Sequence, residues 1–112
     1  MGKLLFTLTL LLTSFGIHAQ QRIVTIDGAV TEIAIALGVA DQIVGRDSTS
    51  LYPISIQALP DVGYLRALSV EGVLSLKPSM ILTTTDAGPI ATLNTLKKIG
   101  VNIHVLDNTY SV

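Results

Sequence analysis

The chain has 112 residues, with seven basic side chains, eight acidic side chains and no cysteine. The basic residues are scattered, so no patch favours binding to nucleic acid or to an anionic membrane surface, and without a thiol we expect neither a disulfide nor a lipid anchor on cysteine. The Gly-x-Gly-x-x-Gly and Gly-x-x-x-x-Gly-Lys-Ser/Thr patterns are also absent, which makes a nucleotide-binding enzyme a poor interpretation.

The first nineteen residues have the pattern of a secretory signal peptide. Lys3 gives a positive start, an apolar run extends over residues 4–12, and Ala19 supplies a small residue for cleavage. The run is shorter than the about 20 apolar residues that a membrane-spanning helix needs. We therefore expect residues 1–19 to be removed and residues 20–112 to form one soluble domain in the periplasm.

The rest of the chain alternates short apolar runs with helical patterns. Strands are expected at 22–26, 42–45, 80–84 and 101–106, and helices at 31–37, 54–59, 70–76 and 90–99. Ser69 is a plausible N-cap for the third helix, and Gly100 ends the fourth. Strands interleaved with helices predict an α/β fold with a mostly parallel four-stranded sheet covered on both faces.

In such a sheet, ligands bind beyond the carboxyl ends of the strands. The loops that begin at Asp27, Arg46 and Asp86 each follow an expected strand. We therefore expect these three loops to share that edge, and the segment around Tyr64 to reach it from its own loop.

Tyr64 and Arg66 stand two residues apart between a Pro-Asp-Val-Gly turn and the helix after Ser69. A cation beside a phenol favours the phenolate, and a phenolate oxygen is a good ligand for ferric iron. The alternative is a half-buried loop tyrosine whose hydroxyl meets a backbone group, beside a solvated arginine. His104 alternates with apolar neighbours, which favours a strand-face or core histidine over a ligand.

Four stretches of the sequence resemble the periplasmic haem-binding proteins of bacterial haem ABC importers, within the ferric siderophore and vitamin B12 binding superfamily. The similarity extends from Arg22 almost to the last residue and is carried by 28–33, by 47–50 with Tyr52-Pro53, by 59–69 and by 71–78. The Gly-Tyr-x-Arg-Ala-Leu-Ser segment, residues 63–69, points to haem.

The resemblance implies a non-catalytic protein that binds haem b as a transported ligand. Tyr64 would supply the axial oxygen to the haem iron, and Arg66 would hold that oxygen ionised. Glu71 would dock on arginines of the inner-membrane ABC permease, which works with its ATPase, while an outer-membrane haem receptor acts upstream. The simpler interpretation of Glu71 is an acid in the first turn of a helix, where the helix dipole favours it.

The resemblance also implies a Rossmann-like N-terminal lobe, half of a two-lobed protein whose lobes are joined by a long helix. Residues 20–112 cover about one lobe, and residues 108–112 look like the start of the linking helix. We therefore expect either a truncated fragment, which could be non-functional, or a lone lobe with weak binding. A binding protein for a ferric siderophore or cobalamin remains the alternative of the same architecture.

Overall fold

The computed structural model describes residues 20–107. The predicted signal peptide at 1–19 and the predicted start of a linking helix at 108–112 lie outside the described residues. The strands are β1 (Ile23–Thr25), β2 (Ile43–Arg46), β3 (Met80–Thr84) and β4 (Asn102–Leu106). The helices are α2 (Gly28–Ala36), α3 (Val70–Ser75) and α4 (Ile90–Ile99), with 3-10 turns η1 (Ala40–Gln42) and η2 (Ile54–Ala58).

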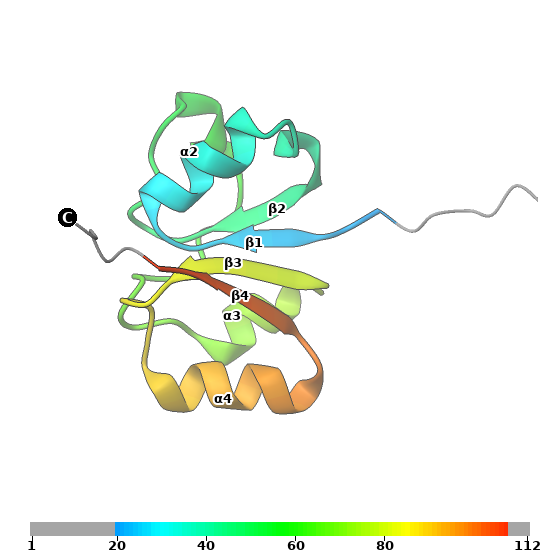
Figure 1. The fold of residues 1–112 in the computed structure, drawn as a ribbon, viewed down its shortest axis with the longest axis vertical. Helices are drawn as coiled ribbons and strands as arrows, with labels where there is room; N and C mark the ends of the chain where they lie inside the picture. Colours follow the sequence, from blue (N-terminus) through cyan, green and yellow to red (C-terminus); the bar gives the residue numbers. More distant parts are fainter. Residues whose placement is uncertain (1–19, 108–112) are drawn as a thin grey trace, which may run out of the picture.

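The four strands form one parallel sheet in the order β2-β1-β3-β4, which confirms the predicted α/β lobe. Helix α2 lies on one face of the sheet, and α3 and α4 lie on the other (Figure 1). Thr25 at the end of β1 pairs with Arg46 at the end of β2 and with Leu82 in β3. The carboxyl ends of β1 and β2 therefore lie side by side, with β3 continuing just beyond them.

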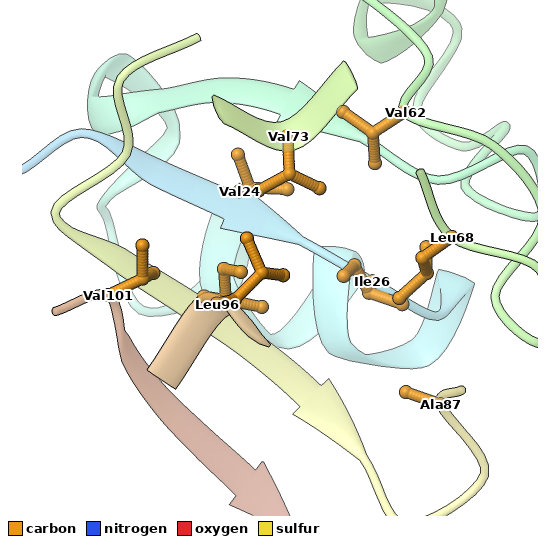
Figure 2. Close-up of a cluster of buried hydrophobic side chains, with 9 residues drawn as sticks. Val24, Ile26, Val62, Leu68, Val73, Ala87, Leu96 and Val101 are labelled. Atoms are coloured by element: carbon orange, nitrogen blue, oxygen red, sulfur yellow. The ribbon is translucent and has the colours of Figure 1, made fainter. Parts of the chain in front are cut away.

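The larger core lies between the sheet and the helices α3 and α4. Val24 of the central strand β1, Val73 of α3 and Leu96 of α4 are all fully buried in it (Figure 2). A smaller cluster under α2 contains Ala34 and Ile43. Every residue of β1 is buried because both neighbouring strands and both helical layers cover it. No helix within residues 20–107 is long and apolar enough to cross a membrane.

The ends of the helices are set largely by capping residues next to them in the sequence. Helix α4 ends at Gly100, whose φ is 107°, and α3 begins after Ser69, whose hydroxyl accepts a hydrogen bond from the Gly72 N–H at 3.1 Å. Both were predicted. Helix α2 begins at Gly28, earlier than the predicted residue 31, because the Asp27 carboxylate caps it by accepting from the Ala29 N–H at 2.9 Å.

Arg46 was predicted to begin a polar loop, and this prediction is wrong. Arg46 is the last residue of β2 and is only 9% exposed. Its N–H donates to the Pro60 carbonyl at 3.0 Å, and its carbonyl accepts from the Val62 N–H at 2.9 Å. Its Nη1 lies 3.4 Å from Asp61 Oδ2, and its Nη2 donates to the Gln57 carbonyl at 3.2 Å. The segment 60–62 thus extends the ladder beside β2, and its Asp61 together with the Gln57 carbonyl of η2 supplies partners for a buried guanidinium.

Candidate functional site

A buried carboxylate joins the loops that follow β1 and β2. Asp47 is 0% exposed, and its Oδ1 accepts from the Asp27 N–H at 2.9 Å and from the Ser50 hydroxyl at 2.7 Å. Its Oδ2 accepts from the N–H and the hydroxyl of Thr49, at 3.1 and 2.6 Å. We call Asp47, Thr49 and Ser50 the Asp47 cluster, together with Thr31, which bonds to Ser50, and Thr25, which bonds to Thr31.

The Asp47 cluster continues into the sheet and toward β3. The Thr31 hydroxyl of α2 lies 2.8 Å from the Thr25 hydroxyl and 2.7 Å from that of Ser50. The hydroxyl of Thr84, at the end of β3, lies 3.4 Å from Asp27 Oδ2. The loops after β1, β2 and β3 therefore meet at one edge, as predicted. The hydroxyls of Thr49 and Ser50, in the loop after β2, are occupied by internal hydrogen bonds.

A second carboxylate shapes the turn that leads to Tyr64. Asp61 Oδ1 accepts from the Gly63 N–H at 2.8 Å, and both of its oxygens lie 2.9 Å from the Ser48 hydroxyl. The Ser48 N–H in turn donates to the Gly63 carbonyl at 2.9 Å. Gly63 has a φ of 108°, a backbone conformation that residues other than glycine rarely adopt. This turn therefore fixes the backbone immediately before Tyr64.

The segment 62–68, which we call the Tyr64 loop, crosses the carboxyl edge from β2 toward β3. On the far side, the Gly88 N–H donates to the Leu65 carbonyl at 2.9 Å, and the Leu68 N–H donates to the Gly88 carbonyl at 3.1 Å. Val62 and Leu68, the first and last residues of the loop, point into the larger core (Figure 2). The loop is thus held by the burial of its first and last side chains and by backbone hydrogen bonds to Gly88.

Between these anchors the loop exposes Tyr64 and Arg66. Tyr64 is 49% exposed, and Arg66 is exposed as well. Within residues 20–107, neither the Tyr64 hydroxyl nor the Arg66 guanidinium has a hydrogen bond or ion pair, to each other or to any other group. The structure places both on the predicted edge with their polar atoms available. Their roles as iron ligand and charge partner stay predictions.

Glu71 is the second residue of the six-residue helix α3, which starts directly after the Tyr64 loop. Its side chain is exposed in the first turn of that helix. This position suits the helix dipole and also leaves the carboxylate accessible to a partner, so the structure is compatible with both interpretations.

Tyr52 and His104 are exposed on segments other than the Tyr64 loop. Tyr52 is 69% exposed and lines an open cavity of about 330 Å³ with Pro53 and with three residues of α2, Glu32, Ile35 and Ala36. His104 is exposed on β4, at the edge of the sheet, which fits a strand-face residue. In the part of the chain that the structure describes, no group of three or more His, Cys, Asp or Glu residues could hold a metal ion.

Sequence reasoning missed the two carboxylates that organise this edge. Asp61 had a readable signal, because aspartate two residues before glycine is typical of a turn in which the carboxylate accepts from the glycine N–H. Asp47 had a local signal too, because it accepts from Thr49 and Ser50 in an Asp-Ser-Thr-Ser run, but neighbouring residues could not predict its bond to the Asp27 N–H, twenty residues earlier in the chain.

Comparison with known proteins gives consistent matches along the lobe. A family model described as "Periplasmic binding protein" matches residues 23–112. A periplasmic haem-binding protein from Pseudomonas aeruginosa superposes with a TM-score of 0.76 at 40% identity, over 78% of this chain and 31% of that one. The haem-binding protein RhuT from Roseiflexus sp. RS-1 gives a TM-score of 0.77 at 40% identity, over 80% of this chain and 35% of that one.

A curated relative is described as a vitamin B12-binding protein. The vitamin B12-binding protein of Yersinia pestis (strain Pestoides F) is 32% identical over 93 residues, which cover 83% of this chain and 33% of that protein. The chain therefore spans about a third of the length of the relatives that it matches.

Proposed function

This chain belongs to the periplasmic binding protein family, and we propose that it is the haem-binding lobe of an ABC importer, with Tyr64 as the iron ligand. The matched family and the solved relatives are binding proteins rather than enzymes. The relatives are periplasmic, which implies the same compartment for this chain. Export through the predicted signal peptide at 1–19 is part of the proposal.

The single observation that carries the proposal is the position of the Tyr64 phenol. It is half-exposed at the carboxyl edge of a parallel sheet, the usual ligand-binding edge, on a loop whose backbone is tied to β2 and to Gly88. A rigid loop that presents an unpaired phenol loses little conformational entropy when that phenol binds a metal. Tyrosinate is an established axial ligand of haem iron.

Arg66 supports the phenolate in this proposal. Its guanidinium is exposed on the same loop and makes no ion pair with any residue in the range 20–107. A positive charge near the phenol oxygen favours the ionised form that binds ferric iron. We therefore assign Arg66 the role of charge partner to Tyr64 in the loaded protein.

Delivery of haem to the membrane completes the proposal. The exposed Glu71 carboxylate at the start of α3 would meet basic residues of an inner-membrane ABC permease that works with its ATPase, because complementary charges steer and orient docking. An outer-membrane haem receptor would supply the ligand to the periplasm. Glu71 follows the Tyr64 loop directly, so ligand and permease would be engaged from adjacent segments.

Titration with hemin, followed by absorbance, tests the ligand and Tyr64 together. We expect a shifted Soret band and a phenolate-to-iron charge-transfer band. Tyr64→Phe should lose the charge-transfer band and at least about tenfold in affinity, equivalent to about 1.4 kcal/mol. Tyr52→Phe is the matched control, because Tyr52 is also exposed and also loses only its hydroxyl. An unchanged spectrum in Tyr64→Phe would contradict the proposal.

The vitamin B12-binding relative supports a second candidate, a cobalamin ligand held by the same lobe, and a ferric siderophore stays the other alternative from the sequence. The haem-binding structures from Pseudomonas aeruginosa and Roseiflexus are more similar to the chain, each at 40% identity, than this relative, at 32%. Parallel titrations with cobalamin and a ferric hydroxamate separate these ligands. Tighter binding of either of them than of hemin would replace haem in the proposal.

A further inference from the structure

We propose that Asp61 is a positioning residue that determines where Tyr64 presents its phenol oxygen. The inference rests on the proposed role of Tyr64 in binding haem and adds the group that holds the ligand in place. Asp61 itself does not need to touch the ligand. It acts through the peptide groups on either side of Gly63, immediately before Tyr64.

The Asp61 carboxylate connects three segments of the carboxyl edge. It accepts from the Gly63 N–H at 2.8 Å, from the Ser48 hydroxyl at 2.9 Å, and from Arg46 Nη1 at 3.4 Å. Arg46 ends β2, Ser48 belongs to the loop after it, and Gly63 begins the turn into Tyr64. A single side chain that is 41% exposed thus joins the strand to the residue immediately before the proposed ligand residue.

Both polar groups of Gly63 depend on Asp61. The N–H donates directly to Oδ1, while the carbonyl accepts from the Ser48 N–H at 2.9 Å, and the hydroxyl of that serine donates to the same carboxylate. The Gly63 φ of 108° needs this support, because a glycine has many other conformations open to it. Fixing the Gly63 dihedrals sets the direction in which the chain enters Tyr64.

No side-chain bond offers an alternative means of orientation. Within residues 20–107 the Tyr64 hydroxyl has no hydrogen-bond partner, and the ring is half-exposed. The far end of the loop is held by Gly88, which bonds to Leu65 and Leu68 without contact to Asp61. Loss of Asp61 should therefore loosen the near end of the loop and leave the far end in place.

Amide hydrogen exchange and hemin titration of Asp61→Ala and Asp61→Asn test this inference on the purified chain. Asp61→Ala should speed exchange of the Ser48 and Gly63 amides at least about tenfold, leave that of Leu68 unchanged, and weaken hemin binding about tenfold, a change of about 1.4 kcal/mol. Asp61→Asn keeps an oxygen that can accept from Gly63, so it should restore affinity to within about threefold.

Asp41→Ala is the matched control, because Asp41 is an exposed acid in η1 and its loss changes net charge by the same amount. Should Asp61→Ala fail to fold, Ser48→Ala removes only the hydroxyl that joins Ser48 to Asp61 and should weaken hemin binding about threefold.

The possible outcomes separate this inference from the proposed function. If Tyr64→Phe binds hemin as the unchanged protein does, the proposed function fails and the role of Asp61 fails with it. If Tyr64→Phe loses the charge-transfer band while Asp61→Ala binds within twofold of the unchanged protein, only the role of Asp61 is overturned. Equal losses in Asp61→Ala and Asp61→Asn would also overturn it, because they would assign the effect to the ion pair with Arg46.

Discussion

The Asp47 cluster and the Tyr64 loop lie at the same edge of the sheet and use polar groups in opposite ways. In the cluster, the side chains bond to one another and to nearby backbone, and Asp47 is completely buried. In the loop, the backbone makes the bonds, and the side chains of Tyr64 and Arg66 face outward. A polar residue that follows a strand is therefore a candidate ligand residue only if its bonding groups are not already used by the fold.

Removing the centre of the Asp47 cluster is expected to have the largest effect on stability. Asp47→Ala deletes four hydrogen bonds to a buried carboxylate and leaves the Asp27 N–H and the Ser50 hydroxyl without that acceptor. Loss of charged, buried hydrogen bonds costs several kcal/mol, so we expect the free energy of unfolding to fall by about 3 kcal/mol or more. Urea denaturation followed by circular dichroism measures it.

Asp41→Ala serves as the control for Asp47→Ala and should leave the urea midpoint nearly unchanged, because Asp41 is exposed. If Asp47→Ala lowers the free energy of unfolding by less than about 1 kcal/mol, the Asp47 cluster does not stabilise the fold, and its contrast with the Tyr64 loop is lost.

A smaller effect is expected from Gly63→Ala, which strains the entry to the Tyr64 loop. A Cβ there would lie 3.2 Å from the Ala67 carbonyl oxygen, and the φ of 108° is unfavourable for alanine. We expect a loss of about 1–2 kcal/mol in the free energy of unfolding, together with weaker hemin binding. Thermal unfolding and the hemin titration measure the two effects.

Gly100→Ala is the matched control for Gly63→Ala, because Gly100 has nearly the same φ, 107°, and no atom within 4 Å of its Cβ position. It should lose a similar amount of stability from the backbone and keep hemin affinity. Equal hemin affinity in the two variants would show that the position of Tyr64 does not depend on Gly63.

The smallest effect on stability is expected from charge reversal at Glu71. Glu71→Lys places a cation in the first turn of α3, which should cost less than about 1 kcal/mol. Hemin affinity should stay the same, while haem uptake by cells that depend on this protein should fall. Ser69→Ala, which removes the cap of the same helix, controls for helix stability. Loss of hemin binding in Glu71→Lys would argue against a docking role.

The elements that the sequence predicted well have all of their signals close together. Helix α4 lies between Pro89 and Gly100, and α3 follows the Ser69 cap, so neighbouring residues specify both. Arg46 was misassigned because the partners of its guanidinium, Asp61 and the Gln57 carbonyl, come from a later segment of the chain. Local patterns contain no information about such partners.

The same distinction applies to the candidate site. Turn residues and the alternation of strands with helices predicted that Tyr64 reaches the carboxyl edge, and the hydrogen bonds of its loop to Ser48 on one side and Gly88 on the other agree with this. The lack of a hydrogen bond between Tyr64 and Arg66 in this structure could not be predicted, because it depends on the orientation of two exposed side chains. The organising role of Asp61 depends on Ser48 and Gly63 being brought together by the fold.

The attachment of the Tyr64 loop has a consequence for local opening of the molecule. Its hydrogen bonds reach back to Ser48, which follows β2, and forward to Gly88, which follows β3. Opening of the chain after either strand would therefore release one end of the loop, even while the four strands stay paired. The residue proposed to bind the ligand thus depends for its position on two segments that are distant from it in sequence.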